Sequence, residues 1–113
     1  MDCIFCQIVH GQSSTEKLYE DDQLIVFRDL HPQAPVHQLI VPKKHIATLN
    51  DLTETDSLLI GALFQTARQL AQKTGVAQTG YRTVFNCNAD GGQAIFHLHL
   101  HLLGGRKLAW PPG

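Results

Sequence analysis

The stretch Phe96-His97-Leu98-His99-Leu100-His101-Leu102-Leu103-Gly104-Gly105 alternates histidine with apolar residues. A β-strand sends successive side chains to opposite faces, so this alternation predicts a strand with one apolar face and one face of imidazoles. The predicted faces hold His97, His99 and His101 on one side and Phe96, Leu98, Leu100 and Leu102 on the other. Because a neutral imidazole can be a nucleophile, a proton carrier or a metal ligand, the row indicates a functional site. Histidines satisfied at a sheet surface are the structural alternative.

The overall composition is that of one small domain. With 113 residues, 43% of them hydrophobic, the chain is expected to form a single domain over residues 1–113. Nine Lys and Arg residues balance ten Asp and Glu residues, and no block of like charge occurs, which argues against nucleic acid as a partner. The sequence has neither a signal-peptide pattern nor the ~20 apolar residues of a membrane span. We therefore expect a cytoplasmic protein with no membrane partner.

Two of the three cysteines, Cys3 and Cys6, form a Cys-x-x-Cys pair, and Cys87 stands alone. In a reducing compartment such a pair indicates metal binding or thiol redox chemistry rather than a structural disulfide. No βαβ pattern surrounds the pair, which weakens the redox interpretation. Two thiolates supply half of a tetrahedral zinc site, so the other half would have to be histidine.

Short strands and two helices account for the rest of the chain. The apolar spacing predicts a short helix over residues 3–9 and strands over residues 18–20, 24–27, 38–41 and 81–86. Residues 21–23 form the turn of a hairpin between the first two strands. Thr53, with Asp56 three residues later, predicts the start of a helix of about 20 residues that ends at Gly75.

Apolar side chains cover an unusually wide arc of the long helix. Two adjacent stripes together span roughly 200°, whereas one core face needs about half of that. The stripes are Leu59, Ala62, Leu63, Thr66 and Leu70, and Ile60, Phe64, Ala67 and Ala71. We therefore expect burial against a second copy of the chain, with deep burial inside one domain as the alternative.

The segment Cys87-Asn88-Ala89-Asp90-Gly91-Gly92-Gln93 leads into the histidine stretch. Its glycines permit positive φ and a close approach of a ligand to the backbone. Asn86 and Gln93 can donate amide hydrogens at its two ends, which is an arrangement suited to an anion. A simple hairpin turn is the alternative, because glycine pairs are common in turns.

Several segments together resemble one known family. Residues 91–106, with the pattern His-x-His-x-His and apolar residues between, look like the signature of the histidine-triad family. Residues 19–22, Asp29 with residues 32–37, Pro42-Lys43-Lys44-His45 and the terminal Trp110-Pro111-Pro112-Gly113 resemble its nucleotide-binding branch of purine nucleoside phosphoramidases. The resemblance implies an α+β fold with an antiparallel sheet of about five strands, one long and one short helix, and pairing as a homodimer.

The same resemblance implies hydrolysis of the P–N bond of AMP-type phosphoramidates through a nucleotidyl-histidine intermediate, with no cofactor in the chemical step. His99 matches the family nucleophile, and His101, Asn86 and Gln93 match its phosphate ligands. Asp29 matches the acid that accepts hydrogen bonds from the ribose. Phe5, Phe27 and Leu30 fall at places that suit the walls of a base pocket, although plain core is the alternative for such residues. His37 is expected to join the histidine cluster without a chemical step of its own.

The cysteine pair implies a metal. Other histidine-triad proteins bind zinc through a similar Cys-x-x-Cys, the histidine of the Pro-Lys-x-His segment and the first histidine of the triad. The matching residues are Cys3, Cys6, His45 and His97, which would form one closed, structural zinc site per chain. Two reduced thiols with no metal are the alternative.

Two other functions stay open from the sequence: a dinucleoside polyphosphate hydrolase, and a nucleotide-binding scaffold or regulatory protein whose hydrolysis is incidental. One residue departs from the family pattern. Many relatives of the phosphoramidase branch have a serine that helps to protonate the leaving amine, and this chain has Ala94 in its place. A methyl group cannot donate a proton, so we expect slow cleavage of substrates with basic alkylamine leaving groups.

Overall fold

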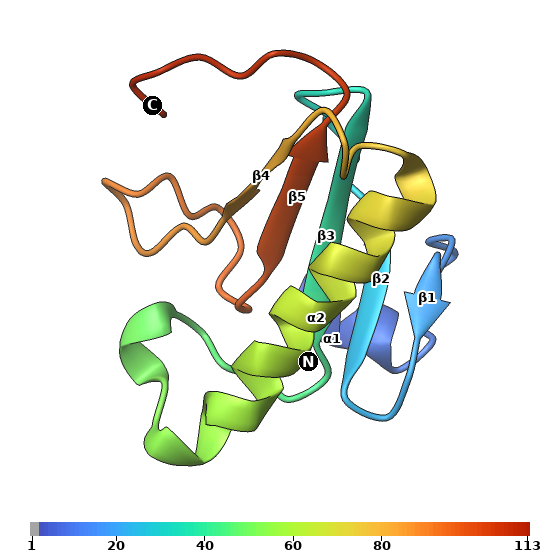
Figure 1. Cartoon of the computed structure of the whole chain (residues 1–113). Coiled ribbons are helices and arrows are strands. Elements are labelled where there is room, and N and C mark those ends of the chain that lie inside the picture. The colour runs from blue at the N-terminus through green and yellow to red at the C-terminus, as the bar shows by residue number, and fades with distance from the viewer. Residues whose placement is uncertain (1–2) are drawn as a thin grey trace.

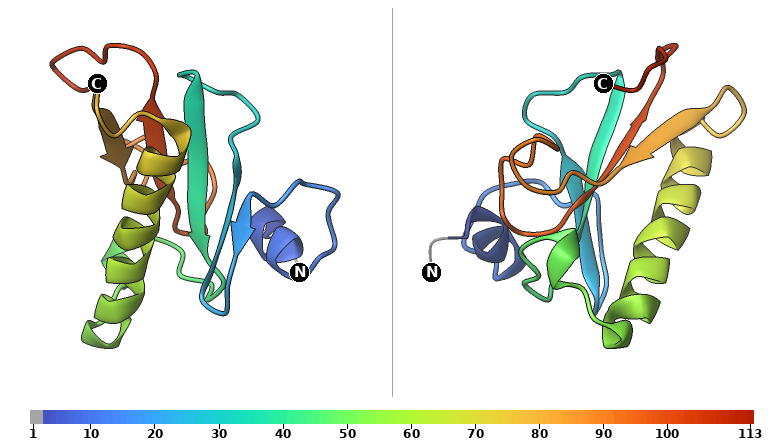
Figure 2. Two further views of the ribbon diagram at one scale, coloured as in Figure 1. Left: turned by 45° about the vertical axis from the view of Figure 1, so that its right-hand side comes forward. Right: turned by 90° about the vertical axis from the view of Figure 1, so that its left-hand side faces the viewer.

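A five-stranded antiparallel sheet separates two helices in the computed structural model, which describes residues 3–113 (Figure 1). The strand order is β1-β2-β3-β5-β4. Figure 2 shows α1 and α2 on opposite faces of the sheet. The elements are α1 (Ile4–Val9), β1 (Tyr19–Glu20), β2 (Leu24–Arg28), β3 (Val36–Pro42), η1 (Leu49–Asp51), η2 (Glu54–Asp56), α2 (Ser57–Thr74), β4 (Tyr81–Val84) and β5 (Leu100–Gly104). The predicted α+β fold is confirmed.

Each face of the sheet carries its own apolar core, because successive side chains of β2 and β3 point to opposite sides. On one face α2 packs over Leu24, Val26, Ile40, Leu100 and Leu102. On the other face Phe5 and Ile8 of α1 pack over Ile25, Phe27, Leu39 and Val41. Residues on the α1 face therefore have only a six-residue helix and loops above them, which leaves room for a cavity.

The predicted hairpin forms as expected. The carboxylate of Asp21 accepts hydrogen bonds from the backbone N–H groups of Gln23 at 2.8 Å and Leu24 at 3.0 Å. This local bonding favours a turn over a continued strand. The following strand β2 pairs with β3 along its whole length, from Leu24 opposite Pro42 to Arg28 opposite Gln38.

The long helix begins three residues later than a helix capped by Thr53 would. The capping box of Thr53 and Asp56 is present, but it starts the 3₁₀ turn η2, and α2 begins at Ser57. Gly75 ends the helix as predicted, with φ of +83°, a left-handed conformation that glycine adopts without steric cost. The prediction was therefore right about the capping residues and the end of the helix, and wrong about the form of its first turn.

The histidine stretch forms less strand than its alternation predicts. Only β5, from Leu100, is strand, and Phe96 is 49% exposed rather than part of the core. Pro42 lies where β3 would continue the pairing, and it has no backbone N–H to donate. Its carbonyl instead accepts a hydrogen bond from the ring of His97, and the backbone N–H of Leu98 donates to Ile46. The ladder therefore stops before His99, and His97 turns away from the other two histidines.

Part of the apolar arc of α2 stays uncovered within this chain. Leu63, Thr66, Ala67, Leu70 and Ala71 are buried, whereas Phe64 is 44% exposed and Leu58 is 87% exposed. The chain thus covers both stripes only in part: Leu59, Ala62 and Ile60 are half-buried, and Phe64 is exposed. Within residues 3–113 no helix combines the length and the apolar character needed to cross a bilayer.

Candidate active site and metal centre

Four side chains of types that can ligate a metal meet at the N-terminal end of α1. Cys3 and Cys6 come from this helix and its cap, His45 from the loop after β3, and His97 from the bend before β5. Their ligand atoms all lie within 4.8 Å of one another. The Nδ1 atom of His97 is 3.4 Å from the Cys3 sulfur, 3.5 Å from the Cys6 sulfur and 3.1 Å from Nδ1 of His45. The Cys6 sulfur is 3.2 Å from Nδ1 of His45.

The tautomer of His97 suits metal binding. A carbonyl oxygen only accepts hydrogen bonds, so the 2.7 Å contact from Nε2 to the Pro42 carbonyl places the ring proton on Nε2. The lone pair on Nδ1 then faces the two sulfur atoms. A backbone carbonyl that holds the second ring nitrogen is a common partner of a metal-binding histidine.

The spacing also fits tetrahedral zinc. Zn–S and Zn–N bonds of about 2.3 and 2.05 Å give S···N and N···N separations of about 3.6 and 3.3 Å in a tetrahedron. The N···S distances of 3.2–3.5 Å and the N···N distance of 3.1 Å are close to these values. Burial raises the pKa of Cys6 and lowers that of His97, so a cation would be needed to stabilise the Cys6 thiolate. The four residues therefore fit a closed zinc site, and the expected convergence of ligands is confirmed.

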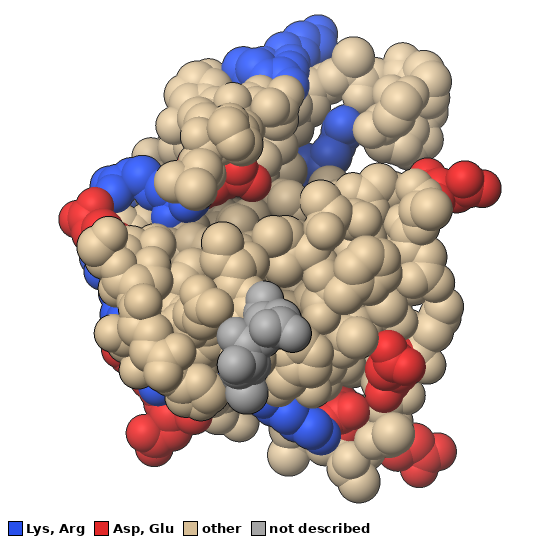
Figure 3. Space-filling model, turned by 180° about the vertical axis from the view of Figure 1, so that it is seen from behind, with Lys and Arg blue, Asp and Glu red and all other residues tan. Residues whose placement is uncertain are grey.

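A cavity of about 310 Å³ opens on the α1 face of the sheet. Apart from the charged groups discussed below, its walls are mostly apolar, and Figure 3 shows that this face carries few charged side chains away from its edges. The residues predicted for a nucleotide site that line the cavity are Phe5, Phe27, Asp29, Leu30, Asn86, His99 and His101. Of the eight residues predicted for the nucleotide site, only Gln93 does not line the cavity.

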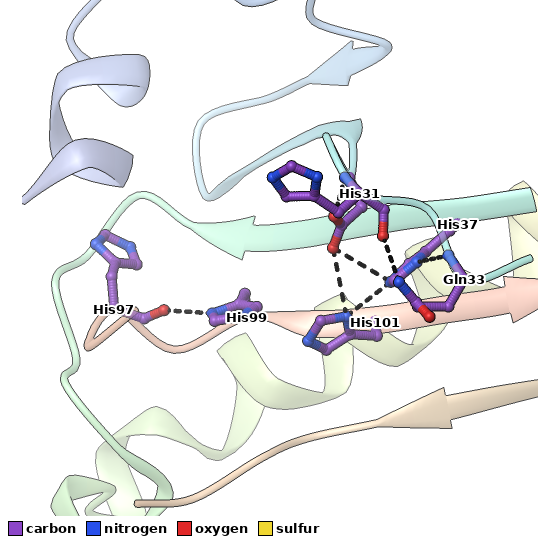
Figure 4. Close-up of polar contacts among 7 residues, drawn as sticks. His31, Gln33, His37, His97, His99 and His101 are labelled. Carbon is purple, nitrogen blue, oxygen red and sulfur yellow. Dashed lines mark hydrogen bonds and ion pairs between the residues drawn. The ribbon is translucent and has the colours of Figure 1, made fainter. Parts of the chain in front are cut away.

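His99 has the tautomer that a nucleophile requires. Its Nδ1 is 2.7 Å from the carbonyl oxygen of His97, so Nδ1 carries the proton (Figure 4). A neutral imidazole has one N–H, which leaves a lone pair on Nε2. Burial lowers the pKa of His99, so the ring is neutral at pH 7.

A chain of hydrogen bonds also determines the tautomer of His101. The backbone N–H of Gln33 donates to Nδ1 of His37 at 3.0 Å, so His37 carries its proton on Nε2. This Nε2 lies 2.9 Å from Nδ1 of His101 and donates to it, so His101 in turn carries its proton on Nε2 (Figure 4). That Nε2 atom is buried and has no hydrogen-bond partner among the described residues. His101 also lines the cavity, so the site contains one hydrogen-bond donor without a partner in the described part of the chain.

Desolvation keeps the hydrogen-bonded rings of His37 and His101 uncharged. Burial lowers the pKa of His37, and burial together with the neighbouring histidines lowers the pKa of His101 to about 4. Both rings are thus neutral at pH 7, and the single proton on each remains directed along the chain.

Asp29 lies beside the hydrogen-bonded rings of His37 and His101. One carboxylate oxygen accepts a hydrogen bond from the backbone N–H of His31 at 2.8 Å, and the other is 3.4 Å from Nε2 of His37 and 4.0 Å from Nδ1 of His101. The three side chains are close enough to hold a cation. However, Nδ1 of His37 accepts the Gln33 N–H, so coordination through Nε2 would require an imidazolate. The cluster is therefore better suited to proton-directed hydrogen bonding than to a metal.

Gln93 has a different role from the predicted one. Its side-chain nitrogen donates to the carbonyls of Ala47 at 2.8 Å and Ile95 at 3.1 Å, and its oxygen accepts from the backbone N–H of Asn88 at 2.9 Å. Both amide hydrogens are therefore used inside the protein, and the side chain does not line the cavity. The prediction that Gln93 binds phosphate is wrong for this arrangement, because the amide holds the loop in place.

The glycines of this loop meet real conformational demands. Gly92 has φ of +80°, and a Cβ atom on Gly91 would lie 2.6 Å from the carbonyl oxygen of Cys87. The loop therefore needs Gly91 for space and Gly92 for its backbone conformation.

Sequence reasoning missed two features of the site. It gave His37 no chemical step, although this residue directs the proton of His101. It also gave no role to the Gln33 backbone and the Pro42 carbonyl, which determine the tautomers of His37 and His97. Backbone groups occur at every position, so no sequence signal distinguishes these two.

Comparisons with known proteins agree with this geometry. Residues 2–108 match the family model described as scavenger mRNA decapping enzyme C-term binding. An uncharacterized HIT-like protein of Synechococcus elongatus is 48% identical over 112 residues, which cover 99% of this chain and 97% of that protein.

Solved structures show the same likeness. A HIT family hydrolase from Legionella pneumophila has a TM-score of 0.97 and 51% identity, over 99% of this chain and all of the other. A histidine triad protein from Clostridium difficile has a TM-score of 0.92 and 44% identity, over 96% of this chain and 95% of the other. The fold is thus that of HIT family hydrolases, and the chain belongs to the histidine-triad (HIT) family.

Proposed function

We propose that this protein hydrolyses the P–N bond of AMP-type nucleoside phosphoramidates through a nucleotidyl-His99 intermediate. The observation that carries the proposal is the tautomer of His99, whose Nδ1 proton is held by the His97 carbonyl while Nε2 is left as a free lone pair. The ring lines a cavity of a size suited to a small ligand. Its lowered pKa favours the neutral, nucleophilic form.

The reaction has two displacements. In the first, Nε2 of His99 forms a bond to phosphorus, the P–N bond breaks, and the amine leaves with the bonding electron pair and takes up a proton from solvent. In the second, a water oxygen bonds to phosphorus, the bond to His99 breaks with its electron pair returning to Nε2, and AMP leaves while the proton of the attacking water passes to solvent. Nucleophilic catalysis replaces one difficult displacement with two easier ones.

The other cavity residues account for binding. The buried Nε2–H of His101 has no partner within the described part of the chain, so it can donate to a phosphate oxygen as charge develops there. The amide of Asn86 is a second candidate donor at the cavity wall. Asp29 would accept hydrogen bonds from the ribose hydroxyls, and Phe5, Phe27 and Leu30 would enclose the base.

The charges of the cavity favour a substrate with a single phosphate. Arg28 is the one Lys or Arg among the described residues that line it, and its guanidinium pairs with Glu16 at 2.7 Å. A dinucleoside polyphosphate carries further negative charges, for which this wall offers no unpaired cation. For this reason we favour phosphoramidates over dinucleoside polyphosphates. An incidental hydrolase that serves as a scaffold would not need the directed tautomers of His99 and His101.

We also propose that Cys3, Cys6, His45 and His97 hold one structural zinc ion per chain. Four protein ligands leave no open position for substrate or water, so the metal would stabilise the fold and take no part in the chemical step. This assignment uses His97 outside the reaction.

A homodimer is the proposed assembly. β4 is an end strand of the sheet. Beside it, Phe64 of α2 packs edge-on against the half-buried Phe85, with ring centroids 5.8 Å apart. Both Phe64 and Leu58 are exposed in the single chain, so they offer an apolar surface to a second copy.

The C-terminal residues 110–113 are a separate part of the proposed dimer. Family likeness suggests that they reach toward the partner's site, and the side chain of Trp110 is 82% exposed in the single chain. Deleting residues 110–113 should change the selectivity among amines more than the affinity for AMP. A monomeric mass by light scattering at micromolar concentration would contradict the dimer.

The function is tested by a substrate panel. Values of kcat/KM should be compared for an AMP-alkylamine phosphoramidate, an AMP adduct with an activated amine and a dinucleoside polyphosphate. The proposal predicts faster turnover of the phosphoramidates. A higher kcat/KM for the dinucleoside polyphosphate would favour the alternative hydrolase, and no turnover of any of the three would favour a binding protein.

A further inference from the structure

One short helix contributes to both sites of the molecule. The four candidate metal ligands Cys3, Cys6, His45 and His97 are called the metal cluster below. Cys3, at the N-cap of α1, and Cys6, in its first turn, belong to it. Ile4, Phe5 and Ile8 of the same helix line the cavity. The two metal ligands and the three cavity-wall residues all lie within residues 3–8, so a rigid shift of α1 would move the ligands and the cavity wall together.

Phe5 makes the most direct connection between the two sites. Its ring is 6% exposed and packs edge-on against Phe27, with centroids 5.2 Å apart, and against His99, with centroids 5.1 Å apart. The same ring lies 6.0 Å from the ring of the metal-cluster residue His97. A single side chain therefore contacts the base wall, the proposed nucleophile and a metal-cluster residue.

The apolar contacts of α1 do not by themselves determine its position. An isolated helix of six residues is not stable in water, so tertiary contacts must hold it. Phe5 and Ile8 rest on the sheet, but burial of apolar surface is non-directional. Bonds from Cys3 and Cys6 to one ion, shared with His45 and His97, would fix the helix in both position and rotation.

We propose that the metal bound by Cys3, Cys6, His45 and His97 sets the nucleotide affinity of the cavity by holding Phe5 against Phe27 and His99. Phe5 is thus a positioning residue that connects the zinc site to the nucleotide site. The inference rests on the proposed function in assigning the cavity to an AMP-type nucleotide and the four ligands to zinc.

The test is a cycle of four proteins: wild type and Phe5→Leu, each loaded with one equivalent of Zn²⁺ or freed of metal by a chelator. AMP affinity is measured by calorimetry, and circular dichroism reports whether each protein is folded. Removing zinc from the wild type should weaken AMP binding about tenfold, on the scale of one well-packed aromatic contact. Phe5→Leu should retain its zinc and weaken AMP binding to a similar extent. Removing zinc from Phe5→Leu should then have little further effect, because the two changes break one connection.

Cys87→Ser is the matched control, since Cys87 lies outside the metal cluster and should leave zinc content and AMP affinity unchanged. Equal AMP affinity with and without zinc in the wild type would overturn the inference, and so would an undiminished effect of zinc removal in Phe5→Leu. If the metal-free protein unfolds, the zinc-loaded Phe5→Leu decides, and unchanged AMP affinity there overturns the inference. Failure of the zinc-loaded wild type to bind AMP would instead refute the assignment of the cavity in the proposed function.

Discussion

The metal cluster and the cavity histidines use the same chemical group in opposite ways. In the metal cluster the His97 proton points away, to the Pro42 carbonyl, and its lone pair points inward at two sulfur atoms. In the cavity, protons and lone pairs alternate from Gln33 through His37 to His101, and the last proton, on the buried Nε2 of His101, has no partner among the described residues. His97 and His99 are two residues apart, yet they belong to different sites. The comparison shows that the hydrogen-bond partner of each imidazole, a backbone carbonyl for His97 and His99 and the His37 ring for His101, determines which ring nitrogen keeps its lone pair.

The largest expected effect separates these two neighbouring histidines. His99→Ala should lower kcat by at least about 10³-fold, because it removes the nucleophile. The variant should keep its zinc, its thermal stability and its affinity for AMP. Steady-state kinetics, metal analysis and calorimetry on one preparation provide the measurement. Substantial remaining turnover would refute the role of His99 and, with it, the contrast between the two sites.

Disruption of the metal cluster should lower the zinc content and the thermal stability more than kcat. Cys3→Ser should lower the zinc content well below one equivalent per chain and lower Tm by at least about 4 °C, which corresponds to roughly 1 kcal/mol for a domain of this size. Cys87→Ser is again the control. If wild type reconstituted with zinc holds far less than one equivalent, the metal site is wrong.

The neutral histidine chain predicts a dependence of stability on pH. Burial lowers the pKa of His101 to about 4, whereas the unfolded residue has a pKa of about 6.5. Between these values the unfolded chain takes up a proton on His101 and the folded chain does not, so stability falls as the pH falls from about 6.5 to about 4. Urea unfolding of wild type and His101→Gln across this range should show a shallower loss for the variant. Parallel curves would mean that His101 titrates alike in both states.

The smallest expected effect concerns the leaving group. Ala94 lines the cavity and cannot donate a proton, so Ala94→Ser should raise the single-turnover rate of nucleotidyl-His99 formation with an alkylamine substrate. A substrate with an activated leaving group should show little change. Equal rates for both proteins with the alkylamine substrate would show that residue 94 is not the position of the proton donor.

The sequence predicts those features that depend on local signals. Asp21 bonds to the backbone two and three residues ahead, and Gly75 ends its helix in a left-handed conformation, so both were recognisable from neighbouring residues. The four candidate metal ligands and seven of the eight residues expected at the nucleotide site lie together as predicted, because the family pattern specifies their residue types. Local alternation could not show that β5 begins only at Leu100, because the ladder is interrupted by Pro42, which is distant in the sequence.

The directions of the hydrogen bonds could not be predicted either. The amide of Gln93 could equally bind a phosphate or a carbonyl, and only the positions of Ala47 and Ile95 decide that it holds the loop. The tautomer of His37 depends on the N–H of Gln33, a group that every residue other than proline carries. Such choices arise from tertiary packing rather than from residue type.

The most direct test of the central claim is the mass of the protein during turnover. Wild type mixed with an AMP phosphoramidate and quenched within milliseconds at neutral pH should carry one added nucleotidyl group, and peptide mapping should place it on His99. The account predicts this adduct on His99 and none on His97, His101 or His37. A nucleotidyl group on any of those three histidines, or full turnover with no covalent adduct at any quench time, would contradict it.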